Sequence, residues 1–142
     1  MTDRRLALVV DLGTSGLKVG VSDLRGHVLW SESHELTTDF GTDGAAVQDA
    51  GDWWSRIAAS SRAAMASRAF DPKDVVAVGV TGQWASTVPT RVDGTPAGPC
   101  LLWLDTRGGP LVRKRLGGPV AGYDPRKLFS FIRASGGVPS RF

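Results

Sequence analysis

The residues best suited to chemistry lie in one short stretch, residues 11–16 (DLGTSG), directly after an apolar run. Its two glycines let the backbone turn tightly and bring N–H groups close to a ligand. Thr14 and Ser15 add hydroxyl donors, and Lys18 adds a positive charge just beyond the turn. Backbone donors, hydroxyls and a cation together form a cradle for phosphate oxygens. The stretch is therefore interpreted as a phosphate-binding loop.

A phosphate cradle has no need of Asp11, because a carboxylate repels phosphate unless a cation lies between them. Mg²⁺ is a hard cation that prefers oxygen ligands and keeps several of its waters. Asp11 therefore predicts a Mg²⁺ site beside the phosphates. The residues alone leave an alternative open, in which the stretch is an ordinary hairpin loop whose Asp and Thr side chains satisfy their own backbone.

The elements that must position this stretch can be read from the apolar periodicity. Three strands joined by short turns are predicted, over residues 6–10, 17–22 and 27–36. Asp52 is the expected N-cap of a helix over residues 53–70, which has one apolar face. Residues 75–80 are nearly all apolar and β-branched, which indicates a central strand covered on both faces. The predicted order is β-β-β-α-β.

Length, charge and cysteine content limit the classes of function. A chain of 142 residues is enough for one domain with one core. Its single cysteine, Cys100, rules out an internal disulfide and is expected to be buried. The first apolar run is too short for a signal or a membrane span, so a cytoplasmic protein with no membrane partner is expected.

Positive charge gathers near the C-terminus, where eight of the seventeen Lys and Arg residues lie between Arg107 and Arg141. Only residues 113–115 (RKR) are contiguous, and the others are separated by Gly and Pro. This spacing favours a solvated or partner-facing surface over nucleic-acid binding, which stays a minor alternative.

Four ordered pieces of the sequence resemble the FGGY carbohydrate kinases, the group of xylulose, glycerol, gluconate and related kinases. The pieces are VVDLGTSGLKVGVSDLRGHVL, VQDAGDWWSRI, VVAVGVTGQWAS and LLWLDTRG. The resemblance implies the actin-like, ribonuclease H-like ATPase fold, an α/β domain whose mixed sheet opens β-β-β-α-β. It also implies ATP and Mg²⁺ as cofactors, with Asp11 at the metal site. Gly13, Thr14 and Ser15 would face the ATP phosphates, and Lys18 would support them.

The same resemblance makes the segments TGQWAS and LWLDTR the walls of a sugar pocket. Gln83 has an amide that both donates and accepts, and Trp84 and Trp103 have flat apolar faces. Together these groups suit the hydroxyls and C–H faces of a polyol. Core packing is the alternative for both tryptophans. Asp105 and Arg107 would either pair with each other or bind sugar hydroxyls.

The implied function is phosphorylation of a sugar or polyol, xylulose or a related pentulose, by MgATP. Xylulose kinases usually carry Met-His-Gly where this chain has Trp84-Ala85-Ser86. A chaperone-like or actin-like ATPase shares the loop, but the polar and aromatic segments after the fourth strand argue against it. The remaining alternative is a non-catalytic lobe that binds sugar or a protein.

The resemblance places residues 1–142 in the N-terminal portion of the first kinase domain. The family's catalytic aspartate, which acts as general base, and its adenosine-binding domain are expected beyond Phe142. The chain alone is therefore expected to be inactive. Its unpaired strand edges predict that it associates with itself or with the rest of the kinase.

Overall fold

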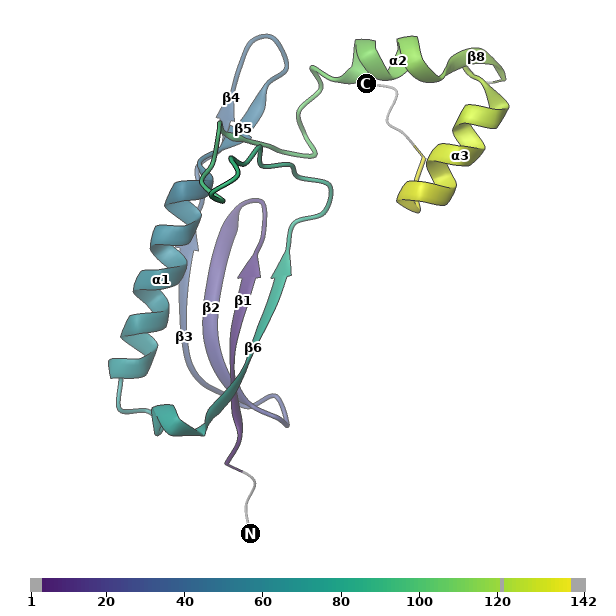
Figure 1. Cartoon of the computed structure of the whole chain (residues 1–142). Coiled ribbons are helices and arrows are strands. Elements are labelled where there is room, and N and C mark those ends of the chain that lie inside the picture. Colours follow the sequence, from purple (N-terminus) through teal and green to yellow (C-terminus); the bar gives the residue numbers. More distant parts are fainter. Residues whose placement is uncertain (1–3, 121, 139–142) are drawn as a thin grey trace. The chain divides into compact units, whose positions relative to one another are not determined.

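A four-stranded mixed sheet in the order β3-β2-β1-β6 forms the larger of two units (Figure 1). The computed structural model describes residues 4–120 and 122–138. The first unit comprises Met1–Asp39 and Val47–Trp103, and the second comprises Phe40–Ala46 and Leu104–Phe142. In the described part of the chain, no helix has the length and apolar character needed to cross a membrane.

The strands of the larger sheet confirm the predicted order; three of them are longer than predicted, and the third, predicted over residues 27–36, is one residue shorter at each end. They are β1 (Leu6–Leu12), β2 (Gly16–Asp23), β3 (Val28–Glu35) and β6 (Val75–Gly82). β1 and β3 each pair antiparallel with β2, while β6 pairs parallel with β1. A short 3₁₀ helix, η1 (Pro72–Asp74), leads into β6. This is the predicted β-β-β-α-β opening.

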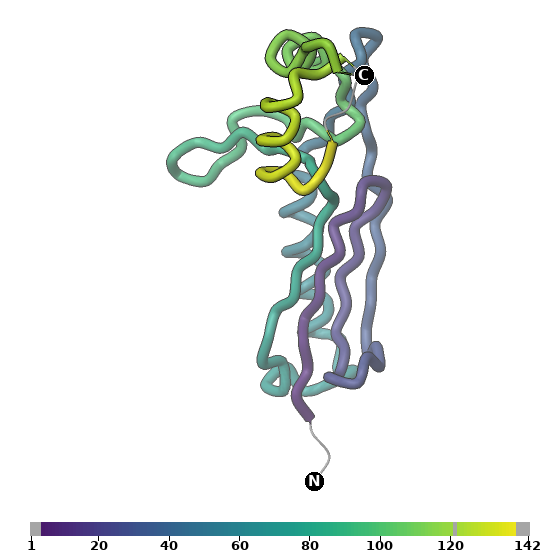
Figure 2. Tube along the Cα trace, turned by 90° about the vertical axis from the view of Figure 1, so that its right-hand side faces the viewer, coloured from purple at the N-terminus to yellow at the C-terminus, as the bar shows by residue number. Residues whose placement is uncertain are grey.

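Helix α1 (Ala50–Ala66) covers one face of the sheet and packs against β1, β2 and β3 (Figures 1 and 2). Alternate residues of β2 face the helix, and Leu17, Val19 and Val21 are fully buried. Ala64 of the helix packs in one cluster with Val21 and the N-terminal end of β1. The apolar side of the hairpin is therefore the core of the first unit.

The predicted N-cap of α1 was wrong by one helical turn. Asp49 caps the helix, because it is extended and its carboxylate accepts a hydrogen bond from the backbone N–H of Gly51 at 2.8 Å. Asp52 lies in the first turn instead, where it pairs with Arg56 at 2.7 Å. A carboxylate in the first turn also suits the helix dipole. Two nearby aspartates could each cap, and the end of the preceding strand selects the earlier one.

The prediction that residues 75–80 form a strand covered on both faces was also wrong for the described chain. β6 is the edge strand of its sheet. Val76, Val78 and Val80 are 58%, 67% and 71% exposed. The reason is that α1 packs mainly on β2 and β3 and leaves β6 uncovered.

The remaining elements are short. A second sheet has the order β4-β5-β7, formed by β4 (Asp39–Phe40), β5 (Ala46–Gln48) and β7 (Cys100–Leu101). The residues between β6 and β7 make a turn at Asp93-Gly94 and form only isolated bridges. The second unit contains α2 (Gly109–Leu116), β8 (Gly117–Val120) and α3 (Pro125–Ser135). Cys100 is buried, as predicted.

The exposed valines of β6 lead to a prediction about association. An unpaired, apolar edge strand is a template for pairing with another chain, so we expect this protein to self-associate in solution. Val78→Lys should weaken that association at least about tenfold, because a charged edge residue opposes strand pairing. Leu24→Lys, at an exposed turn position (56% against 67% for Val78), is the control. Light scattering across a concentration series measures the effect, and a wild-type monomer at all concentrations would contradict it.

Candidate functional site

The turn between β1 and β2 is closed by a hydrogen bond from the backbone N–H of Gly13 to the carbonyl of Gly16, at 2.9 Å. A Cβ atom on Gly13 would lie 3.0 Å from that carbonyl oxygen, and one on Gly16 would lie 3.2 Å from the carbonyl oxygen of His34. Both distances are tight for a side-chain carbon. Glycine is therefore needed at both positions because a neighbouring backbone carbonyl lies too close for a side chain. Backbone conformation is not the reason, since neither glycine has a positive φ.

Asp11 and Lys18 lie directly opposite each other in the β1–β2 ladder. Directly opposed residues of an antiparallel pair project from the same face. That face is the one away from α1, since the neighbouring pair Val10 and Val19 is buried toward the core. Both charged side chains are exposed, and neither forms an ion pair within residues 4–120 and 122–138. A carboxylate and an ammonium group are thus available together beside the loop.

Thr14 joins this loop to residues far away in the sequence. The indole Nε1–H of Trp103 donates to Thr14 Oγ1 at 3.1 Å. The Thr14 hydroxyl in turn donates to Gln83 Oε1 at 3.2 Å. The backbone N–H of Gln83 donates to the carbonyl of Leu12 at 2.7 Å. Loop residue and sugar-pocket residues of the sequence prediction therefore meet in one network inside the first unit.

The sheet explains why these segments meet. β6 runs parallel to β1, so its C-terminal end lies beside the turn that follows β1 (Figures 1 and 2). Ala85, just after this end, has a φ of 56°, a left-handed conformation that non-glycine residues adopt rarely. Such backbone outliers cluster at ligand sites. A turn at residues 84–85 follows the end of β6.

Both predicted pocket tryptophans are exposed, Trp84 by 74% and Trp103 by 56%, so neither ring packs in the core of the described chain. Close to them, two buried polar atoms lack a protein partner in the described chain: Gln83 Nε2 and Ser86 Oγ. A buried donor without a partner costs free energy, so such atoms are often satisfied by water or a ligand. Flat apolar faces next to unpaired polar atoms suit a polyhydroxy ligand.

Gln48 is a residue of the site that the sequence analysis did not assign. Its side chain is 3% exposed, and its Nε2 donates to the carbonyl of Thr14 at 2.7 Å and to Thr38 Oγ1 at 2.8 Å. A polar residue inside the short apolar strand before the helix cap was the available signal. Nothing in the sequence, however, indicates which backbone group its amide meets.

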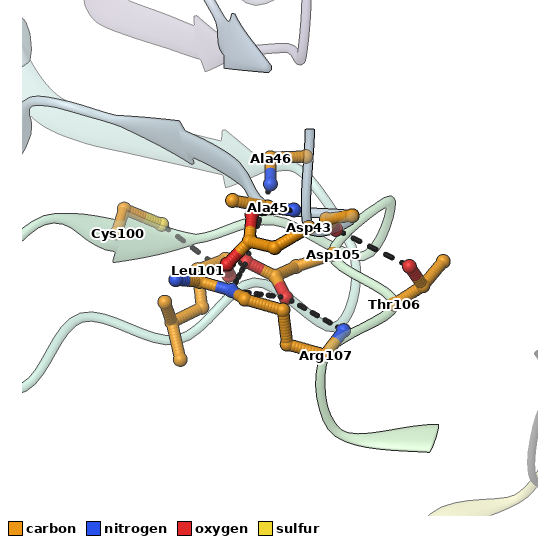
Figure 3. Close-up of polar contacts among 9 residues, drawn as sticks. Asp43, Ala45, Ala46, Cys100, Leu101, Asp105, Thr106 and Arg107 are labelled. Carbon is orange, nitrogen blue, oxygen red and sulfur yellow. Dashed lines mark hydrogen bonds and ion pairs between the residues drawn. The ribbon is translucent and has the colours of Figure 1, made fainter. Parts of the chain in front are cut away.

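Asp105 belongs to the second unit, where its carboxylate accepts three side-chain hydrogen bonds from Arg107 (Figure 3). It also accepts a hydrogen bond from the backbone N–H of Ala46 at 3.2 Å. The Asp105 side chain is only 5% exposed. The hydrogen bonds from Arg107 lower the pKa of Asp105 from 3.8 to about 2. Of the two alternatives for this pair, the structure contains the ion pair.

Comparison with known proteins adds independent findings. Residues 6–115 match the profile described as "FGGY family of carbohydrate kinases, N-terminal domain". A glycerol kinase of Paracidovorax citrulli is 35% identical over 105 residues, which are 73% of this chain and 21% of that protein. A glycerol kinase of Brucella ovis is 30% identical over 101 residues, or 70% and 20% of the two chains. The chain therefore spans about a fifth of the length of these curated relatives.

Solved structures of carbohydrate kinases are similar to this chain in fold. The xylulose kinase from Bifidobacterium adolescentis gives a TM-score of 0.67 at 24% identity, over 99% of this chain and 28% of that one. The xylulose kinase from Rhodospirillum rubrum gives 0.67 at 23% identity, over 90% and 25%. The likeness confirms the expected fold class, the actin-like ATPase type with a mixed α/β sheet.

The Asp105–Arg107 pair generates a pH prediction. Because the folded-state pKa of Asp105 is lowered from 3.8 to about 2, the unfolded chain binds more protons between these two values. The pair's contribution to stability is therefore complete above about pH 4 and is lost as the pH falls through about 2. Asp105→Asn should be less stable than wild type at pH 7, and the difference should vanish near the lower value. Urea denaturation at a series of pH values measures it, and a pH-independent difference would contradict the assignment.

Proposed function

The chain belongs to the FGGY family of carbohydrate kinases, as its N-terminal domain, and we propose that it is part of an enzyme that transfers the γ-phosphate of ATP to a sugar or polyol hydroxyl. One observation carries the proposal. The hydrogen-bond chain from Trp103 through Thr14 to Gln83 links a loop suited to phosphate with side chains suited to a polyol. Phosphoryl transfer requires the donor and the acceptor to be held together, so such a link is what the reaction needs.

The loop residues fit the phosphates of ATP with Mg²⁺. We assign Gly13, Thr14 and Ser15 to the phosphate oxygens, and Lys18 to their negative charge. Asp11 would hold the metal. A single aspartate beside a phosphate-binding loop suits Mg²⁺, because this ion is usually bound by one or two carboxylates together with substrate phosphates and waters. The metal ion would supply neutralisation of the charge on the transferred group.

The acceptor is proposed to be a polyol or a pentulose such as xylulose. The relatives in the comparisons are named as glycerol and xylulose kinases, both of which act on small polyhydroxy compounds by name. Gln83 Nε2 has no hydrogen-bond partner among the described residues, so we assign this donor to a substrate hydroxyl. Trp84 and Trp103 offer apolar faces to the substrate C–H groups. On the basis of the family resemblance, we also assign Asp105 to substrate binding.

The catalytic contribution of these residues is positioning and electrostatic stabilisation. The Thr14 and Lys18 groups would orient the phosphates, while Gln83 would orient the acceptor hydroxyl toward them. We propose that residues 1–142 are the N-terminal portion of the first domain of the complete kinase. The base that removes the hydroxyl proton, and the adenosine-binding domain, would come from other parts of that protein.

The role assigned to Asp11 is tested in the complete protein. Asp11→Ala should lower turnover on the order of 10³-fold or more, because the metal that neutralises the phosphates would lose its carboxylate. The melting temperature should change little, since Asp11 is exposed at the end of β1. Asp93→Ala, in an exposed turn, is the control and should retain full activity. Near-normal turnover of Asp11→Ala at saturating Mg²⁺ would remove the assignment. The 142-residue chain alone should release no ADP in the same assay.

The role assigned to Trp84 is tested by comparing two exposed tryptophans. Trp84→Ala in the complete protein should raise the KM for the polyol about tenfold or more and leave the KM for ATP unchanged. Trp54→Ala, on α1, is matched in exposure (71% against 74%) and should change neither constant. Neither variant should lose much thermal stability. Equal effects of the two changes on the polyol KM would contradict a sugar-binding face at Trp84.

A further inference from the structure

Gln48 is the buried side chain that connects the phosphate-binding loop to the rest of the first unit. One amide nitrogen donates to the Thr14 carbonyl at 2.7 Å and to Thr38 Oγ1 at 2.8 Å. Gln48 lies in β5 and is paired with Cys100 of β7, so its backbone is fixed by the second sheet. Its side chain therefore ties the loop to a rigid element that contains none of the loop's own residues.

The oxygen of the Gln48 amide argues against a role in stability alone. Gln48 Oε1 is buried and has no hydrogen-bond partner within the described chain. A buried acceptor without a partner is destabilising, and an apolar side chain of similar volume would avoid that cost. A purely structural role would favour such an apolar residue at this position. The hydrogen bonds of Nε2 are what an apolar residue could not replace.

The bond from Gln48 holds the backbone of Thr14, whereas the other side-chain contacts hold its hydroxyl. The Thr14 hydroxyl is held by Trp103 and Gln83, and the Thr14 carbonyl is held by Gln48. A residue fixed at both its backbone and its side chain has little freedom to rotate. The direction of its hydroxyl, and of the N–H groups that follow, is then set before a ligand arrives. Such preorganisation lowers the entropy that binding must overcome.

We propose that Gln48 is a positioning residue, which holds the backbone of the phosphate-binding loop at Thr14 in the conformation that receives phosphate oxygens. It acts through Thr14 and does not touch the ligand. The arm of the test that uses nucleotide rests on the proposed kinase function. The arm that uses amide exchange concerns only the loop of this chain.

The first measurement is amide hydrogen exchange in the 142-residue chain. The reporters are the N–H groups of Gly13 and Leu36, which donate to the carbonyls of Gly16 and Ser15 and so close the loop. Gln48→Met should accelerate their exchange about tenfold or more, while the amides in the centre of β2 keep their protection. The melting temperature should shift by less than about 4 °C.

Two further variants sharpen the test. Gln48→Glu keeps the shape and the acceptor oxygens but has no donor when ionised, so it should loosen the loop as Gln48→Met does. Thr38→Val removes the second acceptor and leaves the bond to Thr14 in place, so it should leave the loop amides protected. Acceleration that extends to the centre of β2, or a large fall in melting temperature with both Gln48 variants, would make Gln48 a general stability residue and overturn the proposal.

The second measurement is steady-state kinetics of the complete protein. Gln48→Met should raise the KM for MgATP about tenfold and change kcat at saturating MgATP by less than about threefold, because the loop pays its ordering cost on binding. An unchanged KM for MgATP in an active enzyme would overturn the proposal. Were the wild-type protein to show no kinase activity, the proposed function would fail, and the exchange measurement would still decide the role of Gln48.

Discussion

The hydrogen bonds at Thr14 are the interaction on which the arrangement of the site depends. Three residues, Gln48, Gln83 and Trp103, each bond to this threonine, and each comes from a different segment of the chain. Without these bonds, the β1–β2 turn would be held only by backbone hydrogen bonds, one within the turn and one each from Leu36 and Gln83. The network makes it one body with the end of β6 and the segment after β7. A small loop is thereby held at its backbone and at the Thr14 side chain, which is the rigidity that the proposed phosphate-binding role requires.

The parallel pairing of β6 with β1 makes this network possible. Because the two strands run in the same direction, their last residues, Leu12 and Gly82, are paired at the same end of the sheet. The candidate site lies at that end of the sheet, and its charged residues, Asp11 and Lys18, project from the face opposite to α1. The apolar residues of β2 fill the other face. The buried apolar side chains and the exposed side chains of the proposed site therefore lie on opposite faces of the sheet.

β6 pairs with a strand on one side only in the described chain, and its valines are exposed. Its parallel neighbour β1 is covered by α1. A strand so rich in β-branched residues is typical of a buried sheet position. Its composition and its exposure therefore disagree, and a further protein surface that covers β6 would resolve the disagreement. We expect either another copy of the chain or the rest of the complete kinase to provide it.

The sequence by itself determined the β-β-β-α-β order of elements and the family, because these follow from local periodicity and from residues adjacent in the chain. Residues 11–16 include the turn between β1 and β2, as the apolar periodicity on either side predicted. Tertiary structure alone decided that Asp49 caps α1, that β6 lies at an edge, and that Gln48 holds Thr14. Each of these depends on which distant group a side chain meets or what covers a strand. Pairing across 34 and 89 residues is set by chain packing, which no local pattern encodes.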